Sequence, residues 1–143
     1  MLLAFATICA GIFFGAALYI NLVEHPARME CGPQIALREF RPSYRRASVM
    51  QGSLAVAGCL TGIAGGWLAR DTPAIVAAVL LGLVVPLTLL VIFPTNKRLL
   101  DPDTDATSPK TVELLARWNR LHAIRTILSG AAFIVFLWRF GGR

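Results

Sequence analysis

The chain contains 143 residues, of which 56% are hydrophobic and only 15% are charged, and its mean hydropathy is +0.64. A soluble domain has about 25% charged residues, so this composition excludes an ordinary soluble protein and most enzyme folds built on sheets. The net charge of +6 places basic side chains at a membrane surface, and we expect no nucleic-acid partner. At roughly 20 to 25 residues per crossing, the length allows about four or five spans and no separate soluble domain.

Three uncharged runs predict the first three membrane-spanning helices, over residues 2–25, 47–69 and 72–94. At about 1.5 Å per residue, each run is long enough to cross a hydrocarbon layer of about 30 Å. No Lys or Arg precedes the first run, which is unlike a secretory signal, so we expect this helix to be retained.

A fourth helix is predicted over residues 112–138, although only 13 uncharged residues separate Arg125 from Arg139. This helix reaches across a membrane only if it carries several polar side chains into or near the bilayer, which is a first sign of a functional interior. Together the four helices predict an all-α fold, an integral membrane up-and-down four-helix bundle that forms a single transmembrane domain over residues 1–143.

Small residues and cysteines carry structural information only. Gly58, Gly62 and Gly66 recur every fourth residue in the second span, and Gly11 and Gly15 have the same spacing in the first. We therefore expect close backbone packing, within the chain or in a homodimer. The cysteines have no spacing suited to zinc, so we expect plain thiols and no metal site.

The helical phase of the fourth span separates its polar residues into two faces. Trp118, His122 and Arg125 share one face, which we expect to meet the other helices. Glu113 and Arg117 lie on the opposite face, where we expect them to be exposed and to pair at a spacing of four residues.

The distribution of Lys and Arg predicts the orientation in the membrane. The connections 24–46 and 94–111 hold eight basic residues, whereas the opposite side holds Arg70, Arg139 and Arg143. Because basic residues accumulate in cytoplasmic connections, we expect both long connections in the cytoplasm and both termini outside.

The unusual polar and aromatic residues lie where four helix ends meet at one face of an up-and-down bundle. They are Asn21, Glu24, His25, Tyr44, Gln51, Asn96, Trp118, Asn119, His122 and Arg125. Several have ordinary explanations, since Glu and His sit well among headgroups, Asn is a common turn residue and Trp belongs to interfacial belts. The pair His122 and Arg125 differs, because two ionisable groups on an inward face are functional by default.

Four stretches of the chain resemble a known family. They are GAALYINLVEHPARM (residues 15–29), REFRPSYRRA (38–47), PTNKRLL (94–100) and RWNRLHAIRT (117–126). These stretches are similar to those of the small four-helix membrane proteins that include fungal anthrone oxygenases. The most specific segments are EHPAR, PTN and the WxxxHxxR pattern, and the resemblance covers essentially the whole chain.

The resemblance implies oxidation of an anthrone by O2 to an anthraquinone, without an obvious metal or flavin. The implied base is His122, since an imidazole has an ordinary pKa of about 6.5. Glu24 or His25 is expected to orient the His122 ring or to relay the proton. Arg125 and Asn96 are expected to hold the developing oxyanion. We expect the partners to be a flat hydrophobic aromatic molecule, O2 and membrane lipid. The expected substrate-binding residues are Trp118, Tyr44, Asn21, Gln51 and Asn119.

Two other interpretations use the same residues. In the first, His25 and His122 ligate haem or a transition metal, as histidines of four-helix membrane bundles often do. In the second, the protein is not an enzyme, and the arginines bind a lipid headgroup or a small acidic ligand, or the chain is an accessory protein. A transporter is disfavoured, because no inward polar track continues past Ser129 and Thr88.

Overall fold

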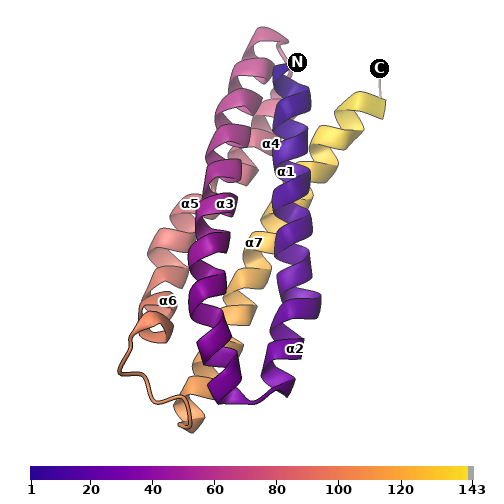
Figure 1. Cartoon of the computed structure of the whole chain (residues 1–143). Helices are drawn as coiled ribbons and strands as arrows, with labels where there is room; N and C mark the ends of the chain where they lie inside the picture. Colours follow the sequence, from indigo (N-terminus) through magenta and orange to yellow (C-terminus); the bar gives the residue numbers. More distant parts are fainter. Residues whose placement is uncertain (142–143) are drawn as a thin grey trace.

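The computed structural model describes residues 1–141, which form a four-helix bundle (Figure 1). The elements in chain order are α1 (Leu2–Tyr19), η1 (Ile20–Glu24), α2 (His25–Glu30), α3 (Pro33–Leu68), α4 (Thr72–Gly82), α5 (Val84–Leu87), η2 (Thr88–Ile92), α6 (Phe93–Leu100) and α7 (Pro109–Gly141). They combine into four long helical segments that run alternately up and down, and each segment is long and apolar enough to cross a membrane. The predicted all-α membrane bundle is therefore confirmed.

The predicted helix ends at the site side were wrong. The four helical segments extend over residues 2–30, 33–68, 72–100 and 109–139. The first and third segments end at residues 30 and 100 instead of 25 and 94, and the second and fourth begin at residues 33 and 109 instead of 47 and 112. Of the two long connections predicted over 24–46 and 94–111, only residues 31–32 and 101–108 lie between helices. An uncharged run marks the part of a helix that suits hydrocarbon, whereas Arg is itself a good helix former and lets the helix continue into water.

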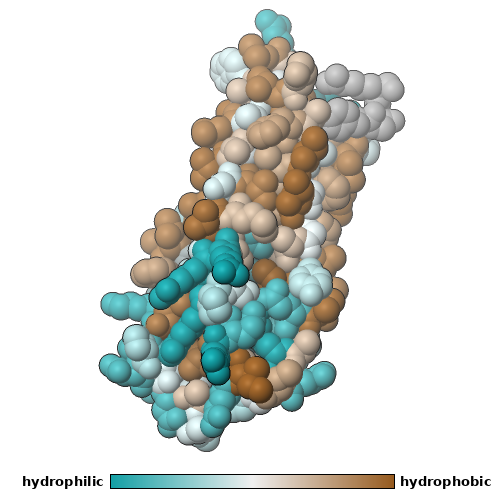
Figure 2. Space-filling model, viewed as in Figure 1, coloured by the Kyte–Doolittle hydropathy of each residue, from teal (hydrophilic) through white to brown (hydrophobic). Residues whose placement is uncertain are grey.

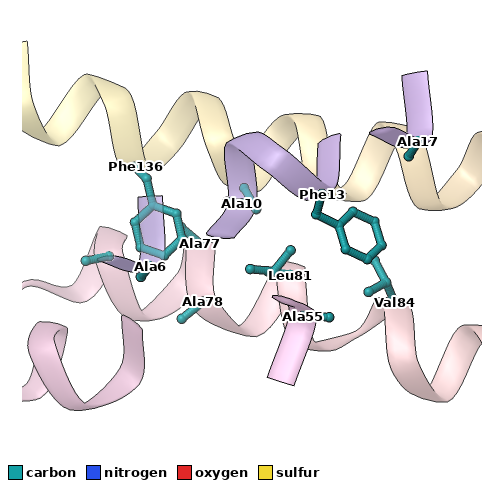
Figure 3. Close-up of a cluster of buried hydrophobic side chains, with 12 residues drawn as sticks. Ala6, Ala10, Phe13, Ala17, Ala55, Ala77, Ala78, Leu81, Val84 and Phe136 are labelled. Atoms are coloured by element: carbon teal, nitrogen blue, oxygen red, sulfur yellow. The ribbon is translucent and has the colours of Figure 1, made fainter. Parts of the chain in front are cut away.

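The half of the bundle nearest the termini is packed with small residues. Leu81, Phe13 and Phe136 fill the space between buried alanines of α1, α3, α4 and α7 (Figure 3). A Cβ added at Gly58 would lie 2.6 Å from Leu81 Cδ2, and one at Gly62 would lie 2.7 Å from Ala78 Cβ. The close approach predicted for the second span is confirmed.

Gly15 does not take part in this packing. It is exposed, and a Cβ added there would meet nothing within 4 Å, whereas one at Gly11 would lie 2.8 Å from Phe133 Cε2. The close packing predicted for the first span therefore holds within the chain at Gly11 and not at Gly15, where packing in a homodimer stays a prediction.

Two wide π-helical turns shape the other half of the bundle. The turn η1 ends two residues before Pro26, and η2 ends two residues before Pro94. A proline has no N–H to return to the preceding turn, so the helix there departs from the regular α-helical ladder. Hydrophilic side chains gather over this half, which contains α2 and α6 (Figure 2).

Candidate active site

The site begins with Asn21, which links η1 to α7. Its amide nitrogen donates to the Asn119 backbone oxygen at 3.0 Å and to Asn119 Oδ1 at 2.7 Å. Its amide oxygen accepts from the Thr126 hydroxyl at 2.5 Å and lies 3.0 Å from His122 Nδ1. Asn21 therefore holds four atoms of α7 through one side chain.

This arrangement determines which nitrogen of His122 carries the proton. A backbone carbonyl only accepts, so the Asn21 atom facing Asn119 must be the NH2 group and the atom facing His122 must be the oxygen. His122 Nδ1 therefore donates, and in the neutral imidazole Nε2 then keeps its lone pair. No hydrogen bond to Nε2 occurs among the described residues, so this nitrogen is available to accept a proton.

Trp118 is enclosed by aromatic rings of the site. Its ring centroid lies 4.8 Å from that of His122 and 5.6 Å from that of His25, and the Phe40 ring meets it edge-on at 5.0 Å. Only 4% of Trp118 is exposed. The indole therefore supports both imidazoles, and it lies against them instead of presenting an open face to solvent.

Arg125 is a buried cation whose contacts are all to neutral groups. It is 7% exposed, donates to Gln51 Oε1 at 2.7 Å and lies 5.4 Å from the centre of the Phe13 ring. Its Nε is buried and has no hydrogen-bond partner, and none of the ion pairs among the described residues involves Arg125. A buried charge without a counter-ion is costly, so this position suits a ligand that carries negative charge.

Asn96 acts on Tyr44 across the bundle. Asn96 is fully buried, and its amide nitrogen donates to the Tyr44 hydroxyl at 3.0 Å, joining α6 to α3. Its amide oxygen has no partner in the structure. Because the Tyr44 oxygen accepts this bond, its own hydrogen is left to donate elsewhere.

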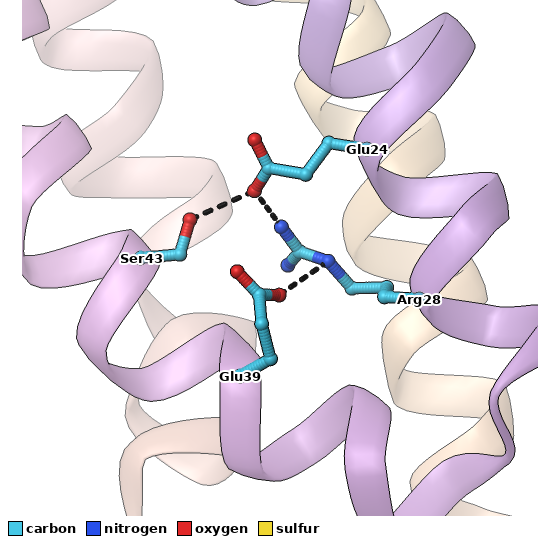
Figure 4. Close-up of polar contacts among 4 residues, drawn as sticks. All are labelled: Glu24, Arg28, Glu39 and Ser43. Carbon is cyan, nitrogen blue, oxygen red and sulfur yellow. Dashed lines mark hydrogen bonds and ion pairs between the residues drawn. The ribbon is translucent and has the colours of Figure 1, made fainter.

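A second polar cluster, formed by Glu24, Arg28, Glu39 and Ser43, joins α2 to α3 (Figure 4). One Glu24 oxygen accepts from Arg28 and, at 2.8 Å, from the Ser43 hydroxyl. Arg28 Nε lies 2.7 Å from Glu39 Oε2. Glu24 is thus engaged with Arg28 and Ser43, and the residue that forms a hydrogen bond with the His122 ring is Asn21.

Three hollows meet at these residues. A narrow void of ≈ 20 Å³ touches His122, Arg125 and Tyr44. It shares Tyr44 and Arg125 with a cavity of ≈ 170 Å³ between α3 and the α5–η2 segment. It shares Glu24 and Ser43 with a groove of ≈ 520 Å³ between α3 and the α1–η1 segment. His122 and Arg125 therefore lie beside a narrow void between two larger hollows.

The residues predicted for the site all lie in the half of the bundle that contains α2 and α6, and the structure joins most of them in pairs. Asn21 contacts Asn119 and His122, and Arg125 contacts Gln51. Glu113 and Arg117 are exposed as expected, but no ion pair between them occurs among the described residues.

Sequence reasoning missed several residues of the site, namely Phe13, Arg28, Glu39, Phe40, Ser43 and Thr126. Arg28 was counted as part of a cytoplasmic connection, although it is 6% exposed. Its spacing of four residues from Glu24 was a usable signal, because such residues are neighbours on a helix. Thr126 shows a similar signal, since it lies four residues after His122 on the same helix.

The donor set does not fit a protein-held metal ion well. No group of three or more His, Cys, Asp or Glu side chains with suitable placement occurs in residues 1–141. His25 and His122 could supply two imidazole ligands to a haem or a metal ion. The Trp118 ring packs against both imidazoles. The chemistry of the site must therefore be considered first from its own side chains.

Comparison with known proteins agrees with the resemblance noted in the sequence. The family model described as anthrone oxygenase matches residues 40–135, a region that includes Tyr44, Asn96 and the site residues of α7. The chain is 31% identical over 137 residues to the anthrone oxygenase tpcL of Aspergillus fumigatus, covering 87% of this chain and 83% of that protein. No solved structure matches the chain. The protein belongs to the anthrone oxygenase family, and it is an oxygenase-like enzyme.

Proposed function

We propose that the protein oxidises a flat, anthrone-like aromatic ketone with O2 at the site around His122. The observation that carries this proposal is that His122, held through Nδ1 by Asn21, lies beside the same void as Arg125, which is buried and has no counter-ion among the described residues. Proton removal from the methylene carbon opposite the ketone of an anthrone requires a base and a nearby cation, because the electron pair moves through the rings onto the ketone oxygen.

The atoms and electrons of the proposed reaction are all accounted for. His122 Nε2 takes a proton from the methylene carbon, and the electron pair of that C–H bond becomes the enolate. The carbanion transfers electrons to O2 and forms a C–O bond, and the resulting peroxide anion takes the proton back from His122 to give a hydroperoxide. Loss of water from the hydroperoxide leaves a second ketone. The carbon loses four electrons and O2 gains four, with one oxygen atom in the product and one in water.

The other residues of the site bind, orient or move protons. Asn21 and Asn119 hold the His122 ring, and Trp118 supports it. Gln51 fixes the Arg125 guanidinium, and Asn96 contributes through Tyr44. His25, whose buried Nδ1 has no partner, and Glu24 are the groups that would relay the proton between His122 and the peroxide oxygen.

We propose that the substrate reaches the site sideways from the membrane. The groove between α1–η1 and α3 is lined by apolar residues such as Tyr19, Ile20 and Met50, and it extends inward to Glu24 and Gln51. A lipid-soluble aromatic molecule suits this route. The site end carries most of the basic residues, which supports a cytoplasmic location for that end and an outside location for the termini.

Oxygen uptake and quinone formation on addition of an anthrone test the proposal. We expect His122→Ala to lower the rate constant by about 10²–10⁴-fold, the usual contribution of a general base. Arg120→Ala, on the exposed face of α7, is the matched control and should keep the wild-type rate. Full activity in a folded His122→Ala protein would refute the assignment of the base.

The absorption spectrum of the purified active protein separates this mechanism from its haem-dependent alternative. We expect no Soret band and full activity after dialysis against a chelator. A Soret band that is lost in His25→Ala and His122→Ala proteins would instead establish the two histidines as haem ligands. Binding of anthrones without any turnover in the wild type would favour a non-enzymatic binding protein.

A further inference from the structure

The cavity between α3 and the α5–η2 segment has the features of a binding site for one end of an aromatic ring system. Apolar side chains, including Phe13, Ala55 and Val84, form much of its wall, and its volume is ≈ 170 Å³. Ligand pockets usually measure about 300–1,000 Å³, so this cavity is large enough for part of a multi-ring ligand only.

Gly52 keeps this cavity open. A Cβ added there would meet nothing within 4 Å, in contrast to the glycines of the packed half, where a Cβ would collide with a neighbouring helix. The missing side chain at Gly52 is therefore not needed for helix packing. It leaves room beside Tyr44 and Arg125 for a flat ring.

Two side chains that line this cavity, Arg125 and Tyr44, have hydrogen-bond donors to spare. Arg125 is more than nine-tenths buried, and only its Nη2 has a hydrogen-bond acceptor, Gln51, among the described residues. The Tyr44 hydroxyl accepts the amide N–H of Asn96, and its own hydrogen has no acceptor among the described residues. A charged donor and a neutral donor at one apolar cavity suit an anionic oxygen attached to an aromatic ring.

We propose that the Tyr44 hydroxyl and the Arg125 guanidinium together bind the ketone oxygen of the substrate in this cavity, and that Asn96 is the positioning residue for Tyr44. This inference rests on the proposed function and assigns its oxyanion-binding groups. When His122 takes the proton from carbon, the electron pair of that C–H bond moves through the ring to the oxygen. The oxygen becomes an enolate that accepts hydrogen bonds from Tyr44 and Arg125, and neither donor loses its proton.

The ionisation of a bound dye tests this assignment without any turnover. The probe is 2-hydroxyanthraquinone, a flat tricyclic phenol whose visible spectrum changes on loss of its proton, titrated with the purified protein in detergent. Donors that stabilise an anionic oxygen favour the ionised dye, so the bound dye should ionise at a lower pH than the free dye in the same micelles. Tyr44→Phe and Arg125→Gln should each raise the apparent pKa of the bound dye by about one unit, a tenfold loss of preference for the anion.

A double-mutant cycle tests the positioning role of Asn96. Asn96→Ala should raise the apparent pKa of the dye in the wild-type background and have no further effect in a Tyr44→Phe background. A purely structural role would give additive effects, and additive effects would overturn the positioning assignment. Gly52→Leu should abolish dye binding by filling the cavity, whereas Gly15→Leu, at another helical glycine with open space, should leave it intact.

Dye ionisation and anthrone oxidation are measured separately, so the oxygen-binding assignment and the proposed function can fail independently. If wild type and Tyr44→Phe ionise the bound dye at the same pH, the binding assignment fails, whether or not anthrones are oxidised. If the dye responds as expected but no anthrone is oxidised, the oxygen-binding site stands and the proposed substrate fails.

Discussion

At the scale of single residues, Asn21 has the largest influence on the chemistry of the site. Its NH2 group is directed to Asn119 and its oxygen to His122 and Thr126, so it determines the tautomer and the orientation of the His122 ring. A general base must present its lone pair to the reacting proton within hydrogen-bond distance. We therefore propose that the Asn21 amide acts on the reaction by orienting His122.

Asn21→Ala should lower the rate constant of anthrone oxidation by about 10²-fold, as misplacement of a catalytic group by about 1 Å does. The ¹⁵N chemical shifts of His122 provide a direct readout, since they should show Nδ1 protonated in the wild type and a mixture of tautomers in the variant. Thr126→Val is the control, because it removes another donor to the same Asn21 oxygen and leaves the His122 bond in place. An unchanged tautomer in Asn21→Ala would contradict this role.

At the scale of elements, the two halves of the chain have similar features in the same order. In both, an apolar helix leads to a π-helical turn, a proline (Pro26, Pro94) and a buried polar residue (Arg28, Asn96), with the same spacing between these features. The following long helix, α3 or α7, then supplies site residues. The Arg125–Gln51 hydrogen bond joins α7 to α3, so the site lies between the two helix pairs.

Close packing of α3 against its neighbours makes a specific prediction about stability. A Cβ at Gly62 would lie 2.7 Å from Ala78 Cβ and 2.9 Å from Phe136 Cζ, so Gly62→Ala should lower the free energy of unfolding by about 1–3 kcal/mol. Gly15→Ala meets nothing within 4 Å and should be neutral or slightly stabilising, because Ala favours a helix by roughly 0.5–1 kcal/mol over Gly. Denaturation of both variants in the same detergent measures the difference, and equal stabilities would contradict the close packing.

At the scale of the whole molecule, the length of α3 determines how deep the site lies. A helix of 36 residues is about 54 Å long, which exceeds the hydrocarbon layer of about 30 Å. The uncharged part of α3 begins at Ala47, directly after Arg45 and Arg46, so we expect Tyr44 at the membrane surface and Gln51 about two turns deeper. A site at the boundary between water and lipid would be accessible both to the proposed lipid-soluble substrate and to a proton acceptor in water.

The orientation of this end is open to a labelling experiment. Cys31 is exposed in the short connection between α2 and α3, so in a Cys9→Ala, Cys59→Ala background a membrane-impermeant maleimide should label it from the cytoplasmic side only. Arg70→Cys, with Cys31→Ser added, reports the opposite end and should be labelled only from outside. The reverse pattern would invert the proposed topology.

The sequence by itself determined the number of helices, the end at which the polar residues gather and the family. These features depend on the length and period of apolar runs and on short motifs such as EHPAR and WxxxHxxR, all of which are local in the chain. The face shared by Trp118, His122 and Arg125 was predicted for the same reason, since the three residues lie on one helix.

Only the tertiary structure decided which side chains meet. Asn21 and His122, like Tyr44 and Asn96, come from distant parts of the chain, and hydrogen-bonded pairs of this kind depend on how four helices are rotated against one another. The helix ends were also beyond the sequence, because hydropathy records where lipid begins, whereas the helix continues as long as its backbone hydrogen bonds are made. For that reason Arg28, placed in a connection by its charge, was found buried against Glu24 and Glu39.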